Sequence, residues 1–271
     1  MKALIVIPSR YGSTRFPGKP LHRIAGHTLL ERVVDLARTA TRGDTDVRIV
    51  VATDHDAIRA HAADIGCDAM MTDSAITSGT GRALAAAKAE GTPPEIVLNL
   101  QGDAPFVPAD AIHRLLDTLR TTDAQAATPV LQLDWAHLDA LRDHKRTSPF
   151  SGTTCVRAPD GRALWFSKNI LPAIRDEAGL RATGTLSPVY RHLGLYAYRL
   201  ATLEWFEATP PSHYEQMEGL EQLRLLERGI RMQTVSAGAQ RIPISGIDTQ
   251  EDAALAERLI AQYGDPFEGQ G

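Results

Sequence analysis

The chain has 271 residues, of which 43% are hydrophobic and 23% are charged, so it has enough apolar residues for one large globular domain or two small ones. Its formal net charge of −4 argues against a nucleic-acid-binding protein, whose binding surface is usually basic. Two cysteines are too few for a disulfide framework, and the first apolar run is too short for a signal peptide or a membrane span. We therefore expect a cytoplasmic protein that contacts neither membranes nor nucleic acid.

The first predicted strand, over residues 3–7, leads directly into a loop rich in glycine, proline and positive charge. Arg10, Arg15 and Lys19 place three cations in this loop, and Gly12 and Gly18 allow its backbone to approach a ligand closely. Ligands of open α/β sheets bind at the carboxyl ends of the strands. The loop therefore predicts a polyphosphate site, with a nucleoside triphosphate as the natural ligand; the alternative is a basic surface loop.

Predicted strands and helices alternate along the first half of the chain. The strands are short and continuously apolar, which is typical of a parallel sheet covered on both faces. This order predicts an α/β protein with a doubly wound, mostly parallel sheet. We expect strands over residues 47–52, 67–71 and 95–100, and helices over 28–40, over 55–65 and from Pro108 onward, the last burying Ile112, Leu115, Leu116 and Leu119.

Two aspartates follow predicted strand ends and are candidate ligands for Mg²⁺. Asp103 follows the strand over 95–100, next to Gln101, which can bond to a sugar or a nucleotide. Asp248 precedes the final helix, which Thr249 caps. Two carboxylates and a triphosphate can together hold a magnesium ion. The simpler alternative is that each aspartate caps a turn or complements a helix N-terminus.

Two further polar turns each have a functional and a structural interpretation. Ser78-Gly79-Thr80-Gly81-Arg82 opens a helix and can bind a nucleobase through its backbone and Arg82, or can be a plain helix start. Asp54-His55-Asp56 has the spacing of a glycosyltransferase metal motif, but an aspartate that caps the following helix is the favoured interpretation.

The pattern changes after residue 145. Residues 146–189 predict a hairpin and loop subregion that turns at Pro159-Asp160-Gly161, inserted into a main domain of residues 1–145 and 190–265. His192 and Tyr196 lie on one face of a strand over 189–199, as ligand donors or as part of a half-exposed strand. Glu221 and Gln222 lie on a helix that the Ser212-x-x-Glu215 capping box opens and that ends near Arg228; a solvated helix face is their simpler role. We then expect a strand over 230–235, a final helix to residue 262 and a flexible tail over 266–271.

These segments, in this order, resemble the 3-deoxy-manno-octulosonate (Kdo) cytidylyltransferases over about residues 2–262. The resemblance implies that CTP and Kdo give CMP-Kdo and diphosphate with Mg²⁺, for lipopolysaccharide or capsule synthesis. It also implies a nucleotide-diphospho-sugar transferase-like fold and a homodimer with contacts through the smaller subregion. The matching segments are IPSRYGSTRFPGKPL, VATDHDAI, SGTGR, NLQGDAPF, RHLGLYAYR, LEQLRLLERG and GIDTQED.

Matching position by position, the resemblance also implies roles for individual residues. The CTP-binding set is Arg10, Ser13, Arg15, Lys19, Ser78, Gly79, Arg82 and Gln101. The sugar-binding set is Gln101, His192, Tyr196, Glu221 and Gln222. Asp103 and Asp248 are implied as the magnesium ligands, and the catalytic set is Arg15, Lys19, Asp103 and Asp248.

Four positions depart from the family pattern and leave the acceptor sugar open. Ala104 and Gly81 replace acidic residues, Lys168 replaces an arginine, whose bidentate bonding lysine does not reproduce, and Thr154 stands at a lysine position. Three alternatives follow: a cytidylyltransferase for a nine-carbon sugar acid such as a sialic acid, a glycosyltransferase that uses Asp54 and Asp56, and a sugar-nucleotide-binding protein without turnover.

Overall fold

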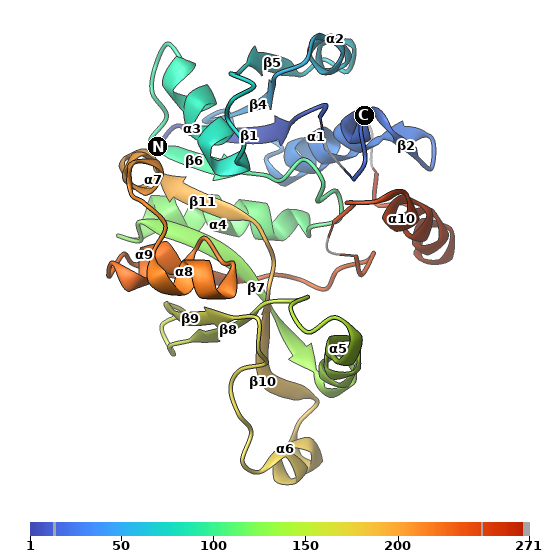
Figure 1. The fold of residues 1–271 in the computed structure, drawn as a ribbon, viewed down its shortest axis with the longest axis vertical. Coiled ribbons are helices and arrows are strands. Elements are labelled where there is room, and N and C mark those ends of the chain that lie inside the picture. Colours follow the sequence, from blue (N-terminus) through green and yellow to red (C-terminus); the bar gives the residue numbers. More distant parts are fainter. Residues whose placement is uncertain (13–14, 245, 268–271) are drawn as a thin grey trace.

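The computed structural model describes residues 1–12, 15–244 and 246–267, and Figure 1 shows its fold. Within them, ten strands form one sheet in the order β5-β4-β1-β6-β11-β7-β10-β8-β9, with β12 paired to β7, and β2 and β3 form a separate hairpin. The strands are β1 (Ala3–Ser9), β2 (Arg23–Ile24), β3 (His27–Thr28), β4 (Val47–Thr53), β5 (Asp68–Met71), β6 (Ile96–Asn99), β7 (Ala126–Asp134), β8 (Thr154–Arg157), β9 (Ala163–Ser167), β10 (Leu186–His192), β11 (Tyr196–Arg199) and β12 (Met232–Ser236).

The parallel part of the sheet confirms the predicted doubly wound α/β class. Strands β5, β4, β1 and β6 run parallel, and β12 runs parallel to β7. Beyond β6 the sheet continues with antiparallel pairs through β11, β7, β10, β8 and β9. Because β1 is central, its side chains are buried on both faces, which explains its continuously apolar sequence.

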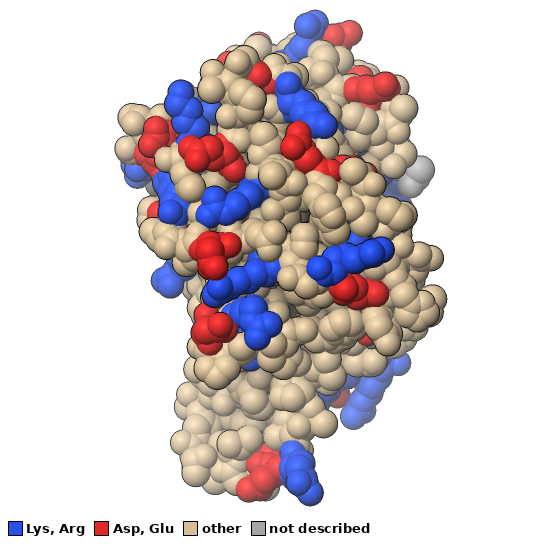
Figure 2. Space-filling view, turned by 90° about the vertical axis from the view of Figure 1, so that its left-hand side faces the viewer, with Lys and Arg blue, Asp and Glu red and all other residues tan. Residues whose placement is uncertain are grey.

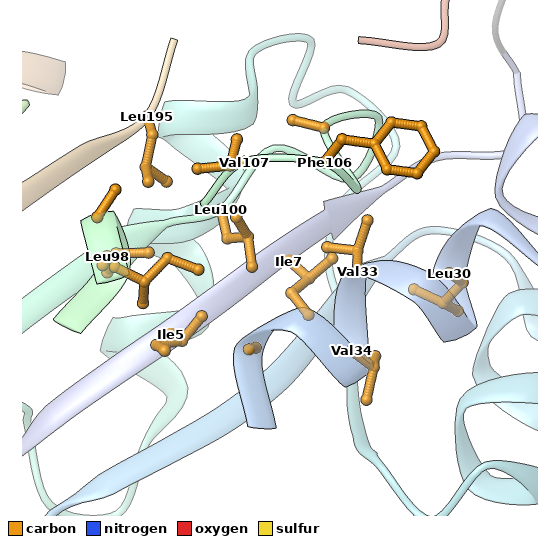
Figure 3. Packing of buried hydrophobic residues seen from close by; sticks show 14 of the residues in the cluster. Ile5, Ile7, Leu30, Val33, Val34, Leu98, Leu100, Phe106, Val107 and Leu195 are labelled. Carbon is orange, nitrogen blue, oxygen red and sulfur yellow. The ribbon is translucent and has the colours of Figure 1, made fainter. Parts of the chain in front are cut away.

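Helices cover both faces of this sheet. On one face, Leu30, Val33 and Val34 of α1 pack toward Ile5 and Ile7 of β1 (Figure 3), and the four residues predicted for α4 are all buried. Each such side chain contributes about 1.5–3 kcal/mol on burial. The helices are η1 (Lys19–Leu21), α1 (Leu29–Ala40), α2 (Asp56–Asp64), α3 (Gly79–Ala89), α4 (Ala109–Thr121), α5 (Trp135–Thr147), α6 (Glu177–Thr183), α7 (Leu200–Ala208), α8 (His213–Glu218), α9 (Leu223–Glu227) and α10 (Gln250–Tyr263).

Two predicted elements are divided in the structure. The strand predicted over 189–199 is broken between β10 and β11, where Gly194 lies. The helix predicted from Ser212 to Arg228 ends at Gly219, which has a left-handed φ of 63°, and resumes as α9. The capping box of Ser212 and Glu215 is confirmed.

The segment over residues 146–189 forms the predicted hairpin, β8 and β9, which turns at residues 158–161. A helix, α6, lies where we expected only loop. Strand β8 pairs with β10, so the hairpin continues the main sheet, and a small apolar cluster around Trp135 and Val189 lies next to it. The division of the chain into a main domain and this subregion stays a prediction.

Segments from the two ends of the chain meet at one side of the molecule. Helix α10 lies next to β2 (Figure 1), and the Ala25 N–H donates to Glu257 Oε1 of α10 at 3.1 Å. Asp265 accepts bonds from Arg32 of α1 at 2.7 and 2.9 Å, and the Phe267 ring stacks on His27. The carboxyl-terminal helix is therefore fixed against the segment that follows the first loop.

Charged side chains of both signs are interspersed on the face drawn in Figure 2. Most of the ion pairs join such surface groups, as in the pair between Arg48 Nη2 and Asp68 Oδ2 at 2.9 Å. Pairs of this kind contribute little to stability because water screens them. Within the described residues, no helix has the length and apolar character needed to cross a membrane.

Candidate active site

A cavity of about 290 Å³ lies at the carboxyl ends of β1 and β6. It gathers side chains from the first loop, from the start of α3, from the turn after β6 and from the segment before α10. Its lining residues are Pro8, Ser9, Arg10, Arg15, Lys19, Pro20, Thr77, Ser78, Gly79, Arg82, Gln101, Gly102, Asp103 and Asp248. Ser13, the remaining residue of the implied CTP-binding set, lies outside the described residues.

Two close backbone approaches bring these segments together. A Cβ on Gly102 would lie only 2.4 Å from the Pro8 carbonyl oxygen, so the turn after β6 packs directly on the end of β1. The Ile247 N–H donates to the Asp103 carbonyl oxygen at 2.8 Å. Asp248 is therefore adjacent to Asp103. Our expectation that Asp248 follows a strand is wrong, because the described residues before it, from 238 to 247, are irregular.

The ammonium group of Lys19 bridges the two aspartates. Its Nζ lies 2.9 Å from Asp103 Oδ2 and 3.3 Å from Asp248 Oδ1. Lys19 opens η1 directly after Gly18, whose φ of 69° turns the chain there. Arg15 Nη2 adds a second cation 3.2 Å from Asp248 Oδ1. The two carboxylates thus converge on one positive charge, the arrangement that a bound cation requires.

Asp252 orients Asp248 through the predicted cap of the last helix. Thr249 accepts from the Asp252 N–H, and Asp252 Oδ2 accepts from the N–H groups of Asp248 and Thr249, both at 2.9 Å. We had expected no role for Asp252, although the Thr-x-x-Asp spacing, which resembles a capping box, is a signal that could have identified it.

Arg82 is 2% exposed and is one of the residues that line the cavity. Its Nη2 donates to Asp54 Oδ2 and to the Ile76 carbonyl oxygen, each at 2.9 Å. Asp54 is thereby committed to Arg82, and His55 rather than an aspartate caps α2. Our expectation that an aspartate of this turn caps the helix is wrong, and the ion pair also argues against a metal motif there.

A second cavity, of about 370 Å³, adjoins the first and shares Gln101, Asp103 and Asp248 with it. His192 lies in its wall, with Nε2 2.8 Å from Thr128 Oγ1. Because the Thr128 hydroxyl donates to the Leu195 carbonyl oxygen, it accepts from His192 Nε2, which leaves Nδ1 without a proton. The other lining residues are Ala104, Val107, Leu193, Gly194, Gln240, Gly246 and Asp252.

Burial and, to a smaller extent, the nearby Lys168 ammonium together lower the pKa of His192 to about 3. The imidazole is therefore neutral at pH 7. A neutral ring with a fixed tautomer offers a directed hydrogen-bond acceptor. It does not offer a positive charge to a substrate.

Tyr196, Glu221 and Gln222 line neither of these two cavities but form a buried polar cluster. The Tyr196 hydroxyl donates to Gln222 Oε1 at 3.0 Å, and Thr80 Oγ1 donates to Glu221 Oε2 at 3.2 Å. Gln222 is 1% exposed, and within the described residues its Nε2 has no hydrogen-bond partner. Our alternative, that Glu221 and Gln222 form a solvated helix face, is wrong. The two residues lie between α8 and α9 and not within a helix, and Gln222 is buried.

Comparisons with known proteins agree with this geometry. A family model described as cytidylyltransferase matches residues 4–233. A 3-deoxy-manno-octulosonate cytidylyltransferase of Maricaulis maris (strain MCS10) is 42% identical over 98% of this chain and 99% of its own. One from Legionella pneumophila (strain Lens) is 36% identical over 94% and 95%. A solved CMP:2-keto-3-deoxy-manno-octonic acid synthetase in complex with CTP superposes with a TM-score of 0.80 at 30% identity, over 97% of this chain and 99% of its own.

The chain belongs to the Kdo cytidylyltransferase family. It is therefore a nucleotidyltransferase with the α/β fold of that family.

The structure also locates the four positions at which this cytidylyltransferase departs from the family pattern. Ala104 lines the second cavity. Thr154 is fully buried and bonds to the backbone of Asn169 and Leu171, so it does not reach either cavity. Lys168 lies within electrostatic reach of His192. Gly81 lies in the first turn of α3, next to Ser78.

Proposed function

We propose that the protein transfers CMP from CTP to Kdo or a close 3-deoxy-2-keto sugar acid and releases diphosphate. The observation that supports this most strongly is the pair of adjoining cavities that share Asp103 and Asp248. The first cavity carries the cations of the first loop and suits a triphosphate. The second offers hydrogen-bonding groups, the neutral Gln101, His192 and Gln240 beside the aspartates, and suits a polyhydroxylated acceptor. The shared aspartates would lie where the two substrates meet.

In the proposed reaction, the anomeric hydroxyl of the sugar acid attacks the α-phosphorus of CTP in line. A new bond forms from that oxygen to phosphorus, the bond to the β-phosphate oxygen breaks, and diphosphate leaves. Catalysis of this type rests on alignment and charge neutralisation. Lys19, Arg15 and Arg10 would neutralise the triphosphate and the leaving diphosphate. Ser78, Gly79 and Arg82 would contact the nucleoside, and Gln101, which lines both cavities, would contact both substrates.

Asp103 and Asp248 fit a Mg²⁺ site in which the nucleotide supplies the remaining ligands. Within the described residues, no group of three or more His, Cys, Asp or Glu side chains could hold a metal alone. Mg²⁺ commonly binds through one or two carboxylates together with phosphate oxygens and water. Lys19 already occupies the position of a cation between the two aspartates. When bound, Mg²⁺ would polarise the α-phosphate, and Lys19 would turn toward the phosphates.

For the acceptor, we propose that His192 Nδ1 accepts a bond from a sugar hydroxyl. Tyr196, Glu221 and Gln222 would form the inner boundary of the acceptor site, with Glu221 and Gln222 supplying groups after a shift of the segment between α8 and α9. The unpartnered Nε2 of Gln222 supports this role, because a buried amide without a partner costs free energy unless a ligand satisfies it. The homodimer and the cytoplasmic location implied by the sequence remain predictions.

The test is diphosphate release from each of the four nucleoside triphosphates against a panel of sugar acids. We expect release only with CTP, with Kdo-type acids preferred over sialic acids by at least about tenfold in kcat/KM, which corresponds to about 1.4 kcal/mol. Preference for a nine-carbon acid would replace the proposed acceptor. CTP binding by calorimetry without release from any acid would show a binding protein that has lost turnover.

A further inference from the structure

Helix α3 begins differently from the other helices that open on a serine or threonine cap. Helices α1, α8 and α10 each carry a complete capping box, in which the third residue is Glu31, Glu215 or Asp252. Ser78 caps α3 and accepts from the Gly81 N–H at 2.9 Å, but Gly81 has no side chain and the first turn of α3 contains no acid. Half of the reciprocal arrangement is therefore missing from the chain's own α3.

A carboxylate from another helix fills this position. A Cβ on Gly81 would lie 2.8 Å from Glu207 Oε2, 2.9 Å from Ser78 Oγ and 3.2 Å from Ile76 Cγ2. Glu207 is the penultimate residue of α7, which packs on α3. Its carboxylate thus occupies the space that an acidic side chain at position 81 would need.

The position of Glu207 in its own helix strengthens this observation. An acid in the last turn of a helix is unfavourable, whereas an acid at a helix N-terminus is favourable. Within the part of the chain that the structure describes, Glu207 forms no ion pair, and Arg224 on α9 pairs with Glu215 instead. Burial raises the pKa of Glu207, and although Arg224 acts on it in the opposite direction, its Oε2 faces the first turn of α3.

We propose that Glu207 is a positioning residue for nucleotide binding, because it completes the cap of α3 from α7. This inference rests on the proposed function, in which Ser78 and Gly79 line the CTP side of the site. Gly79 also has Gln101 Oε1 3.3 Å from the point where its Cβ would be. If the first turn of α3 became less ordered, Ser78 and Gly79 in the wall of the nucleotide cavity would therefore move together with Gln101.

We expect the effect of a substitution at position 81 on CTP binding to depend on whether Glu207 is present. Without Glu207, CTP should bind more weakly, while the chemistry on bound CTP stays the same. We expect Glu207→Ala to raise the KM for CTP about three- to tenfold with kcat within about twofold of the parent, the effect of losing one cap. Adding Gly81→Glu places the acid on α3 itself and should return the KM to within about twofold of the parent.

The decisive measurement is the double-mutant cycle in KM for CTP. Gly81→Glu should improve binding only when Glu207 is absent; alone, it crowds a second carboxylate against the first. Equal effects of Gly81→Glu in both backgrounds, or an unchanged KM in Glu207→Ala, would overturn the inference. Glu207→Gln, which keeps the shape and removes the charge, replaces Glu207→Ala in the cycle if the alanine variant does not fold.

Glu204 supplies a matched control. It lies one turn earlier on α7, and its Oε1 lies 3.7 Å from Lys88 Nζ near the other end of α3. Glu204→Ala also removes an acid between the same two helices, yet it should leave the KM for CTP unchanged. A rise equal to that of Glu207→Ala would assign the effect to general packing of α7 on α3 and would overturn the positioning role.

Failure of the proposed reaction would not hide the result. Amide hydrogen exchange at residues 79–82 of the free protein reads the cap directly and needs neither turnover nor ligand. We expect faster exchange in Glu207→Ala and parent-like exchange when Gly81→Glu is added. Unchanged exchange in Glu207→Ala would contradict the inference even in a chain that uses another nucleotide or acceptor.

Discussion

The two cavities of the site differ in whether they carry positive charge. The nucleotide cavity is lined by cations, which range from the exposed Arg15, at 66% in its side chain, to the buried Arg82. The acceptor cavity adjoins it, and its described lining residues include no lysine or arginine but a half-buried, neutral His192 beside three aspartates. Among the described residues, only Gln101, Asp103 and Asp248 line both.

This difference in lining side chains suits the two cavities to two chemically different substrates. Lys19 and Arg15 pair with carboxylates in the structure, and in the proposed reaction they would exchange these carboxylates for phosphates when a nucleotide binds. Such exchange is reversible because each bond lost is replaced by a bond of the same kind. The neutral groups of the acceptor cavity are held by hydrogen bonds, such as that between His192 and Thr128, which fix their direction. In the proposed function, positive charge would therefore bind the nucleotide, and directed hydrogen bonds would select the acceptor.

The largest expected effect comes from neutralising a shared aspartate. Asp103→Asn should lower kcat about 10²–10³-fold, because it removes a charged contact that acts where the two substrates meet. The fold should remain, since Asp103 is partly exposed and its backbone bond to Ile247 is unaffected. Steady-state kinetics together with a thermal unfolding midpoint measure both. A variant with parent-like turnover would refute Asp103 as a metal ligand and would leave the two cavities without a functional junction.

A smaller effect is expected from removing the bridging cation. Lys19→Met should lower kcat about 10–10²-fold, the loss of one hydrogen bond between charged groups. It should also tighten Mg²⁺ binding in the absence of nucleotide, because Asp103 and Asp248 lose the ammonium that lies between them. Calorimetry with magnesium alone tests this second effect. Weaker magnesium binding in the variant would show that the aspartates do not share the ion.

The sequence predicts the cationic nucleotide cavity better than the acceptor cavity. Arg10, Arg15 and Lys19 lie in one short loop after a buried strand, so local pattern and the rule for strand ends place them together. Gly102 likewise follows a recognisable strand, although only the structure shows that it is packed against the Pro8 carbonyl. Such features depend on residues close in sequence and on the parallel order of β1 and β6.

The acceptor cavity and the polar cluster of Tyr196, Glu221 and Gln222 depend on contacts that no local pattern contains. The break between β10 and β11 places His192 of the cavity and Tyr196 of the cluster on different strands, and after the turn at Gly219 Gln222 is buried instead of exposed. The partnership of Glu207 with Gly81 joins helices more than one hundred residues apart. Periodicity cannot identify such tertiary partners. The glycine that replaces an acid at position 81 did, however, indicate the position that Glu207 contacts.

The smallest expected effect tests whether His192 in the acceptor cavity is neutral. Because His192 has a pKa of about 3 in the folded chain and an ordinary value of 6.5 when unfolded, the unfolded chain binds a proton that the folded chain does not between these pH values. The stability that depends on neutral His192 is therefore fully present above pH 6.5 and is lost as the pH falls toward about 3. The slope is about 1.4 kcal/mol per pH unit for one proton.

Urea unfolding between pH 7.5 and pH 5 measures this slope. In His192→Gln, the free energy of unfolding should depend less steeply on pH, by the slope that one proton contributes. This holds whatever stability the variant loses at pH 7.5. Lys168→Gln keeps the histidine and removes the second cause of its lowered pKa, so the loss should begin near the same pH but end at a higher one. An unchanged slope in His192→Gln would mean that the imidazole takes up its proton in the folded chain. The acceptor cavity would then carry a cation like its neighbour, and the contrast between the two would no longer hold.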